Sequence, residues 1–284
     1  MTVTPSRGII ALLRLPYWMM TGGLSLITAF AITKQLLGFD TILLIFFSMA
    51  CITSAGFSLN DYFDRESDAI IKPKRPIPSG ALSLKQVVTI SASLFTVGLI
   101  LALLINWSSF FILLIDCILL VIYSAIVKCK SGFAANVLVG LMVGTAFLYG
   151  EATVSQTISL ISISLYPICF GTIGGNILRD ILSFEGDSKI GYPTLPKKIG
   201  FKGSIQIASF FFVATAILAP LPFLFQFFTV FYVILIALWG ILLFYSSIRL
   251  VTSQPTIENV RKYERLITMS MMLLILSLIV EAVV

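Results

Sequence analysis

The chain has 284 residues, of which 58% are hydrophobic and only 11% are charged, whereas a soluble domain is about half apolar and about a quarter charged. This balance excludes a water-soluble core and indicates that the chain folds in lipid. The absence of histidine excludes a haem or zinc held by imidazole, a Ser-His-Asp triad and a histidine general base. The four cysteines show no CxxC pairing, which argues against a disulfide framework or a zinc site.

Apolar stretches of about 20 residues, each long enough to cross a bilayer, follow one another along the chain. Backbone polar groups in hydrocarbon must be satisfied internally, so these stretches are expected to be helices. The pattern predicts an all-α, multi-spanning membrane protein with a single domain, 1–284, and no cleavable signal peptide. The nine predicted spans are 15–33, 41–59, 86–105, 109–127, 133–150, 157–178, 204–225, 227–248 and 264–283.

The positive charges predict the orientation of these spans. Lys and Arg gather before the first span and after the second, fourth, sixth and eighth, and only Lys34 lies on the other side. The positive-inside rule then places the N-terminus and these loops in the cytoplasm and the C-terminus outside. The net charge of +6 is therefore an orientation signal, and no nucleic-acid partner is expected.

Two of the predicted cytoplasmic loops, about 60–85 and 179–203, hold seven of the thirteen acidic residues. In the first loop, Asn60, Asp64 and Asp68 are spaced i, i+4, i+8 and share one face if the second span's helix continues through them. Like charges at this spacing repel one another unless a cation lies between them. Oxygen ligands without sulfur or imidazole suit Mg²⁺, which completes its shell with water and substrate phosphates.

The second loop repeats this arrangement. Asn176, Asp180, Ser183 and Asp187 fall at i, i+4, i+7 and i+11, again on one helix face. Two Asn-xxx-Asp faces in corresponding loops predict two acidic walls around one pocket, and basic residues follow each wall. Such a pocket suits a diphosphate, because metal and cations neutralise the charge on a departing pyrophosphate. The alternative is that both loops are merely solvated, but their matched spacing favours a site.

The run 60–80 resembles the first signature of the UbiA superfamily of intramembrane prenyltransferases. Glu185, Gly186 and Asp187, followed by Gly191 and the run 194–196, resemble the second signature. The resemblance covers essentially the whole chain. It implies an all-helical bundle around a central cavity that opens to the cytoplasmic side of the cell membrane. It also implies Mg²⁺-dependent transfer of a polyprenyl group from its diphosphate to a hydrophobic acceptor among membrane lipids.

The resemblance also assigns roles to individual residues. It implies that Asp64, Asp68, Asp180 and Asp187 are catalytic and, with Asn60, hold Mg²⁺ and the prenyl diphosphate. Further candidates for substrate binding are Arg14, Asn60, Asp61, Arg75, Tyr123, Lys128, Asn176, Arg179, Ser183 and Lys189. Many members carry an aspartate where this chain has Ser183. A second metal would then rest mainly on Asp180 and Asp187, or bind through water.

Members of the superfamily differ mainly in their acceptor. The run 130–150 looks closest to the archaeal ether-lipid branch, in which geranylgeranyl diphosphate is the donor and geranylgeranylglyceryl phosphate the acceptor. The run 65–70 and Ser183 look closer to chlorophyll-synthase-like members. We expect the ether-lipid acceptor, with a quinone precursor or a chlorophyllide-type acceptor as the alternative. Haem is not expected, because the motif variant of that branch is missing.

A rival from another class is a cation transporter, which would place its carboxylates near the membrane midplane. Here the acidic clusters lie at helix ends, which favours the enzyme. A phosphatidyltransferase should carry a DGxxAR-type motif, which the sequence lacks. Asp116 lies in the middle of the fourth span, and the sequence leaves open whether it is a functional group or a hydrogen-bonded structural carboxyl.

Overall fold

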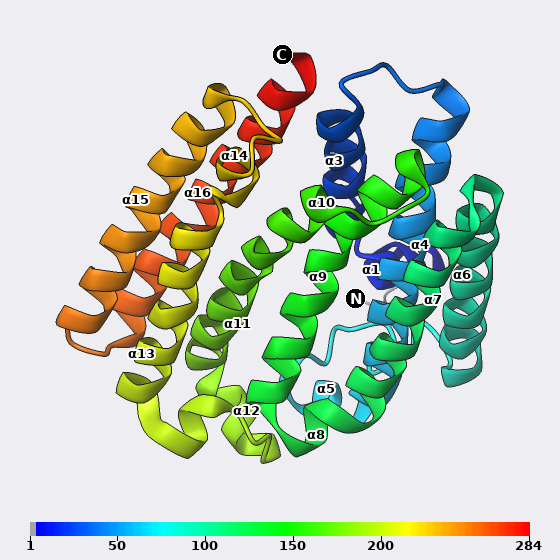
Figure 1. Ribbon diagram of the computed structural model, residues 1–284. Helices are drawn as coiled ribbons and strands as arrows, with labels where there is room; N and C mark the ends of the chain where they lie inside the picture. The colour runs from blue at the N-terminus through cyan, green and yellow to red at the C-terminus, as the bar shows by residue number, and fades with distance from the viewer. Residues whose placement is uncertain (1–3) are drawn as a thin grey trace.

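The computed structural model describes residues 4–284, and this part of the chain is helical with no β-strand. Helices labelled α are α-helices, η1 and η2 are π-helices and η3 is a 3₁₀-helix (Figure 1). In chain order they are α1 Pro5–Leu13, α2 Pro16–Trp18, η1 Met19–Gly23, α3 Leu24–Thr33, α4 Phe39–Phe63, α5 Arg65–Ile71, α6 Leu84–Ile105, α7 Trp107–Ile122, η2 Tyr123–Val127, α8 Lys128–Lys130, α9 Gly132–Ser155, α10 Leu160–Leu165, η3 Tyr166–Cys169, α11 Phe170–Leu182, α12 Phe184–Ile190, α13 Leu195–Leu218, α14 Leu221–Leu224, α15 Val230–Thr252 and α16 Ile257–Val283.

Within residues 4–284, nine helical segments are long and apolar enough to cross a membrane, which confirms the predicted number of spans. Several begin earlier than the hydropathy pattern predicts. The seventh begins at Leu195 rather than at 204, and the ninth at Ile257 rather than at 264. Apolar residues mark only the part of a helix that lies in hydrocarbon, whereas the hydrogen-bonded backbone continues into charged turns at the interface.

The first span is less regular than a single helix. Arg14 follows α1 in the left-handed conformation, with φ of 51°, and Pro16 begins α2. Proline has no backbone N–H to donate, so it is tolerated at the start of a helix and not in its interior. The π-helical turn η1 then leads into α3. This break at Arg14 places its side chain beside the first acidic loop.

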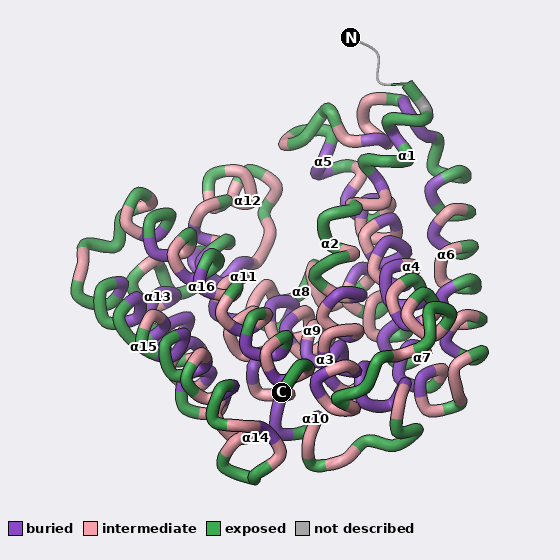
Figure 2. Tube along the Cα trace, turned by 90° about the horizontal axis from the view of Figure 1, so that it is seen from above, coloured by how far each residue is buried: buried purple, intermediate pink, exposed green. Residues whose placement is uncertain are grey.

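α9 lies between two groups of helices. It contacts α3 and α7 in the first half of the chain and α11 in the second half. Beyond these, α4 packs against α6, and α13 packs between α11 and α15 (Figures 1 and 2). The C-terminal helix α16 contacts α15, α11 and also α3. The two acidic loops therefore approach each other across α9.

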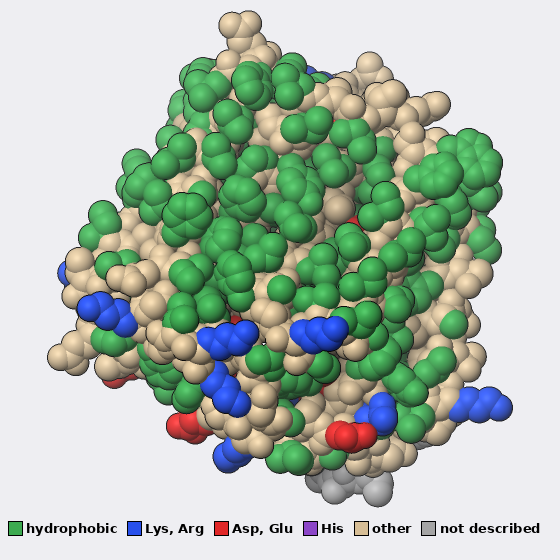
Figure 3. Space-filling view, turned by 60° about the horizontal axis from the view of Figure 1, so that its bottom comes forward, with side chains coloured by type: hydrophobic (Ala, Val, Ile, Leu, Met, Phe, Trp, Pro, Cys, Tyr) green, Lys and Arg blue, Asp and Glu red, His purple; other side chains and the backbone are tan. Residues whose placement is uncertain are grey.

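The two ends of the bundle differ in character. The short helices α5, α8 and α12 lie at one end, and the C-terminus lies at the other (Figure 1). Hydrophobic side chains cover the flank of the molecule, and Lys and Arg side chains gather toward the end that carries these short helices (Figure 3). The fold is that of a multi-pass membrane protein with one polar end that holds both acidic loops.

The two acidic loops have the same backbone construction. Asp64, with φ −83° and ψ 1°, separates α4 from α5. Ser183, with φ −98° and ψ 3°, separates α11 from α12. Each interruption is followed by a short helix of 7 residues. The predicted continuous helices are therefore broken at one residue each. Aligned on these breaks, Asp61 corresponds to Asp180 and Asp68 to Asp187.

This alignment differs from the Asn-xxx-Asp pairing expected from sequence. Asn60 corresponds to Arg179 in the fold, and Asn176 lies one turn earlier on α11. The i to i+4 backbone hydrogen bonds persist through both breaks. The Asp68 N–H donates to the Asp64 carbonyl at 2.8 Å, and the Asp187 N–H donates to the Ser183 carbonyl at 3.0 Å. Despite the break, Asp64 and Asp68 lie on one side of the first wall, and Asp180 and Asp187 lie on one side of the second.

Candidate active site

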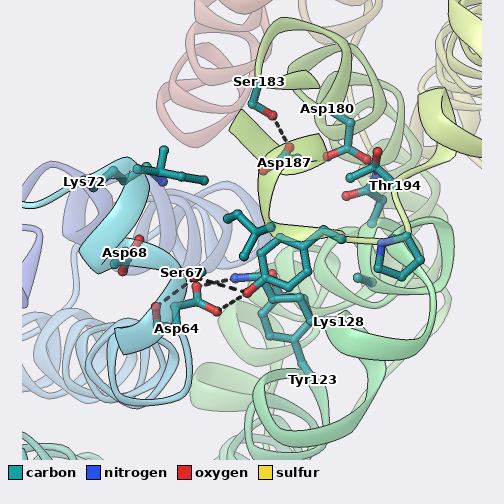
Figure 4. A pocket seen from close by; sticks show the side chains of 17 residues that line it. Asp64, Ser67, Asp68, Lys72, Tyr123, Lys128, Asp180, Ser183, Asp187 and Thr194 are labelled. Carbon is teal, nitrogen blue, oxygen red and sulfur yellow. Dashed lines mark hydrogen bonds and ion pairs between the residues drawn. The ribbon is translucent and has the colours of Figure 1, made fainter. Parts of the chain in front are cut away.

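A cavity of about 210 Å³ lies between the two acidic loops. Asp64 lines it from the break between α4 and α5, and Asp68 lines it from α5. Asp180 and Asp187 line it from α11 and α12 (Figure 4). The structure therefore brings the four predicted catalytic carboxylates into one space. The other lining residues are Ser67, Ile71, Lys72, Tyr123, Lys128, Gly132, Ala135, Asn136, Ser183, Ile190, Tyr192, Pro193 and Thr194.

Asp64 is held by groups from three separate segments. Its Oδ1 accepts a hydrogen bond of 2.8 Å from the Tyr192 hydroxyl, and its Oδ2 accepts one of 2.9 Å from Asn60 Nδ2. Lys128 Nζ forms an ion pair with the same Oδ2. Asn60 does not line the cavity, so its side chain supports Asp64 from behind.

Behind Asp68 lies a layer of paired charges. Arg75 donates to Asp68 Oδ2 at 2.5 Å and to Asp61 Oδ1 at 2.8 Å. Arg14 donates to the same oxygen of Asp61 at 2.6 Å. Asp61 is only 4% exposed and does not line the cavity. Arg14, Asp61 and Arg75 thus fix the first wall, and buried charges of this kind are tolerated when paired.

The second wall is held by uncharged partners. Asn136 Nδ2 on α9 donates to Asp180 Oδ2 at 2.8 Å. Ser183 Oγ donates to Asp187 Oδ2 at 2.5 Å (Figure 4). The Ser183 hydroxyl therefore orients its neighbour and adds no fifth carboxylate to the cavity lining.

Two lysines, Lys72 and Lys128, line the cavity. Partial burial, and then the neighbouring Arg75 guanidinium, lower the pKa of Lys72, so an anionic ligand beside it would favour its charged form. Lys128 Nζ lies 5.3 Å from the centre of the Tyr192 ring. Burial raises the pKa of Tyr192, and its phenol therefore remains a hydrogen-bond donor at neutral pH. Tyr123 lines the cavity from the π-helix η2.

Seven of the ten predicted substrate-binding residues do not line the cavity. Four of them, Arg14, Asn60, Asp61 and Arg75, support the first wall, whereas Asn176, Arg179 and Lys189 have no contact with it. Arg179 donates to Asn176 Oδ1 at 3.1 Å and to Glu264 Oε1 at 3.3 Å, and its side chain is 52% exposed. Lys189 is exposed on α12. Neither Arg179, Asn176 nor Lys189 is among the residues around the cavity.

The cavity also contains residues that sequence reasoning did not select as site residues, among them Ser67, Lys72, Asn136, Tyr192 and Thr194. Lys72 and Thr194 lie within the two signature runs. A polar side chain near the polar end of a long apolar helix is a weak signal that could have pointed to Asn136. No local pattern marks Tyr192, because its partner Asp64 is 128 residues away in sequence.

The donor set of the cavity fits Mg²⁺. In the described part of the chain, no group of three or more His, Cys, Asp or Glu side chains is arranged to hold a metal by itself. Mg²⁺ does not require such a cage, because it binds through one or two carboxylates and takes water and phosphate oxygens for the rest. The two pairs of carboxylates, with no sulfur or imidazole ligand, meet this requirement.

Asp116 lies apart from the cavity lining, between α7 and α9. It is 4% exposed, and Thr145 on α9 is hydrogen-bonded to its Oδ2 at 2.7 Å. The other carboxyl oxygen, Oδ1, has no hydrogen-bond partner among the described residues. The structure thus gives Asp116 a packing partner in the membrane interior and no contact with the acidic walls.

Comparison with known proteins places this arrangement in a family. The model of the UbiA prenyltransferase family matches residues 19–274. A digeranylgeranylglyceryl phosphate synthase from Natronomonas pharaonis is 35% identical over 222 residues, which cover 77% of this chain and 78% of that protein. The synthase of the same name from Methanocaldococcus jannaschii is 34% identical over 241 residues, or 85% of this chain and 84% of the relative.

Solved structures agree with the sequence relatives. A structure of digeranylgeranylglyceryl phosphate synthase in membranes is similar with a TM-score of 0.84 and 30% identity, over 98% of this chain and 99% of the other. A UbiA homologue from Archaeoglobus fulgidus bound to GPP and Mg²⁺ shares the fold, with a TM-score of 0.70 and 18% identity over 96% of this chain and 99% of that one. The chain therefore belongs to the UbiA prenyltransferase family.

Proposed function

We propose that this protein transfers a geranylgeranyl group from geranylgeranyl diphosphate to geranylgeranylglyceryl phosphate, with Mg²⁺ as cofactor. The observation that carries the proposal is the cavity itself, in which Asp64 and Asp68 face Asp180 and Asp187 beside two lysines. The acceptor is inferred from the relatives, several of which are digeranylgeranylglyceryl phosphate synthases at 34–35% identity. An acceptor with an aromatic ring is the alternative that the experiment below distinguishes.

Different residues of the cavity would bind the metal ion, the diphosphate and the prenyl chain. Asp64, Asp68, Asp180 and Asp187 would hold Mg²⁺, which neutralises charge on the diphosphate and stabilises pyrophosphate as it leaves. Lys72 and Lys128 reach the same space and add positive charge where the leaving group develops negative charge. The apolar helices around the cavity hold the prenyl chain and exclude water from the reacting carbon.

The chemistry requires few other groups. The C–O bond of the allylic diphosphate breaks, the electron pair leaves with pyrophosphate, and a hydroxyl oxygen of the acceptor forms the new C–O bond. The hydroxyl proton must then be removed, and a carboxylate of the cavity is suited to accept it. Arg14, Asp61 and Arg75 contribute by keeping the first wall in place.

The distribution of charge supports an orientation for this reaction. α5 and α12, which carry part of the cavity lining, lie at one end of the bundle (Figure 1), and basic side chains gather toward that end (Figure 3). By the positive-inside rule this end faces the cytoplasm, so we propose a cell-membrane protein with its active site on the cytoplasmic side. Both substrates would then enter where soluble Mg²⁺ is present.

The test is a mass-spectrometric assay of the purified protein in detergent with Mg²⁺ and geranylgeranyl diphosphate. The acceptors are geranylgeranylglyceryl phosphate, a quinone precursor and chlorophyllide, each supplied separately. We expect the first acceptor to gain one geranylgeranyl unit and the reaction to stop when the metal is chelated. Asp64→Asn should lower the rate by about a hundredfold or more, as expected when metal binding is impaired.

Asp40→Asn is the matched control, because Asp40 is an exposed carboxylate at the opposite end of α4. It should keep the wild-type rate. Prenylation of the quinone precursor or chlorophyllide alone would replace the proposed acceptor and leave the reaction class intact. No product with any acceptor, together with cation flux in vesicles, would favour a transporter over the enzyme.

A further inference from the structure

Tyr192 connects the two acidic loops. It follows α12 in the second loop, yet its hydroxyl donates to Asp64 Oδ1 in the first wall at 2.8 Å. The same hydroxyl lies 3.4 Å from Ser67 Oγ on α5. It is the residue through which the segment after the second wall directly contacts the catalytic carboxylate of the first.

The backbone around Tyr192 is fixed on both sides. Its N–H donates to the carbonyl of Asp187 at 3.1 Å, and Gly191 before it has the positive φ of 82° that glycine adopts without strain. After it, the carbonyl of Pro193 accepts a hydrogen bond of 3.0 Å from the Gly132 N–H at the start of α9. Tyr192 is thus mounted on a segment that α9 and α12 hold in place.

Gly132 shows how closely this segment is packed. A Cβ atom at that position would lie 2.8 Å from the Cα of Thr194 and 3.1 Å from the carbonyl oxygen of Pro193. Real Cβ atoms do not approach backbone this closely, so only glycine permits the observed distance. The position of the Tyr192 side chain follows from this contact as well as from its own hydrogen bond.

The hydrogen bonds to Asp64 determine which lone pairs of its carboxylate remain free to bind a metal ion. A carboxylate offers about four lone-pair positions. Asn60 and Lys128 occupy Oδ2, and Tyr192 occupies one position on Oδ1. The second lone pair of Oδ1 would then be the position left for Mg²⁺. Its direction depends on the hydrogen bond from Tyr192, which orients the carboxylate. The Tyr192 ring also lies 5.3 Å from Lys128 Nζ, so it contacts the counterion of Asp64 too.

Asp64 is a carboxylate at the helix break of the first wall, whereas its counterpart at the second break is not an acidic residue. The corresponding break in the second wall carries Ser183, which is uncharged and hydrogen-bonded to Asp187. Of the two residues at the helix breaks, only Asp64 is a carboxylate. No second carboxylate at the equivalent position across the cavity can replace it as a metal ligand.

We propose that Tyr192 is a positioning residue that orients Asp64 for Mg²⁺ and makes metal binding at the first wall depend on the second loop. The inference rests on the proposed Mg²⁺-dependent function and adds a residue to it. Groups that orient a metal ligand through a hydrogen bond change metal affinity by about 10–100-fold when they are removed.

The experiment measures metal binding without catalysis. Mn²⁺ replaces Mg²⁺ as a paramagnetic probe, and its binding to the purified full-length protein is followed by electron paramagnetic resonance with inorganic pyrophosphate present. Tyr192→Phe removes the hydroxyl and keeps the ring beside Lys128. We expect it to weaken Mn²⁺ binding by about tenfold with an unchanged unfolding temperature. Tyr192→Leu should weaken it further, because the contact with Lys128 is also lost.

Tyr166→Phe is the matched control, since the Tyr166 hydroxyl donates at 2.9 Å to the Leu141 carbonyl and does not line the cavity. It should bind Mn²⁺ as the wild type does. Equal Mn²⁺ binding by wild type and Tyr192→Phe would overturn the role of Tyr192 and leave the proposed function intact. A wild type that binds no Mn²⁺ with pyrophosphate would overturn both. Wild-type binding without prenyl transfer would overturn the proposed function alone.

Discussion

At the scale of single residues, the charges around the cavity are not equivalent. Asp61, Asp64 and Asp68 are each paired with an arginine or lysine. Lys72 lines the same cavity, and none of the ion pairs in the described part of the chain includes it. A cation that has no carboxylate partner beside a cavity of this chemistry is available to a diphosphate.

Lys72→Gln should therefore raise the KM for the prenyl diphosphate. A hydrogen bond to a charged group contributes about 1.5–3 kcal/mol, which corresponds to about a tenfold change or more. Lys74→Gln is the control, because Lys74 lies two residues away, is likewise exposed and is not in the cavity lining. Steady-state kinetics with varied donor concentration measure both variants. An unchanged KM for Lys72→Gln would show that this lysine does not contact the diphosphate.

The sequence predicted the acidic residues of the cavity better than their supports. Asp64, Asp68, Asp180 and Asp187 could be found because carboxylates at helical spacing are conspicuous beside apolar spans. Asn60, Arg75 and Ser183, which also hold these carboxylates, lie in the same runs and were predicted with them. Other supporting groups come from elsewhere in the chain. Asn136 is 44 residues from Asp180 and Tyr192 is 128 residues from Asp64. Local spacing holds no information about such pairs.

At the scale of helices, the position of the second wall depends on how closely α9 approaches α11 and the turn η3 before it. A Cβ atom at Gly140 would lie 2.3 Å from Ile173 Cγ1 on α11, and one at Gly144 would lie 2.9 Å from the Cβ of Cys169 at the end of η3. Small residues at such interfaces allow membrane helices to pack closely without a hydrophobic driving force. This packing brings Asn136 on α9 within hydrogen-bond distance of Asp180 on α11.

Gly140→Ala should force α9 and α11 apart and weaken that hydrogen bond. Overpacking of this kind costs about 1–3 kcal/mol, so both the unfolding temperature and the prenyl transfer rate should fall. Gly175→Ala is the matched control on α11, because a Cβ there would meet nothing within 4 Å. Thermal unfolding in detergent and initial rates are the measurements. If the two variants behaved alike, the close approach at Gly140 would not be needed for the site.

The number of membrane spans could be read from hydropathy, but the breaks in their helices could not. The interruptions at Asp64 and Ser183 fall inside stretches that are continuous in helical periodicity. The tertiary structure shows that the two loops are repeats aligned on these breaks. The two corresponding residues nevertheless differ in role, because their partners differ. Asp61 pairs with Arg14 and Arg75 and does not line the cavity, whereas Asp180 accepts a hydrogen bond from Asn136 and does.

At the scale of the whole molecule, an ion pair between an exposed lysine and a buried carboxylate lies at the end opposite the cavity. Lys34, which follows α3, lies 2.7 Å from Glu281 on α16, and the Glu281 side chain is 0% exposed. The backbone N–H and the hydroxyl of Thr229 also donate to this carboxylate, at 2.9 and 2.7 Å. The pair joins the first span to the last.

Lys34→Met should lower stability without altering the active site. The carboxylate of Glu281 would keep its Thr229 contacts but lose its cation, which costs about 1–3 kcal/mol for a buried charged group. We expect a lower unfolding temperature in detergent and an unchanged KM for the prenyl diphosphate. Lys85→Met, at an exposed lysine in the first turn of α6, should change neither. A raised KM in Lys34→Met would indicate that the two ends of the bundle are coupled.

The sequence by itself determined that this protein folds in lipid, that it has nine spans and two acidic loops, and which family it resembles. These properties depend on composition and on spacing within one segment, where helical geometry is fixed. Only the tertiary structure decided which side chains meet: that Tyr192 holds Asp64, that Asn136 holds Asp180, and that Arg179 turns to Glu264. Such contacts arise from the packing of helices distant in sequence, and close packing depends on the shapes of all the surfaces involved.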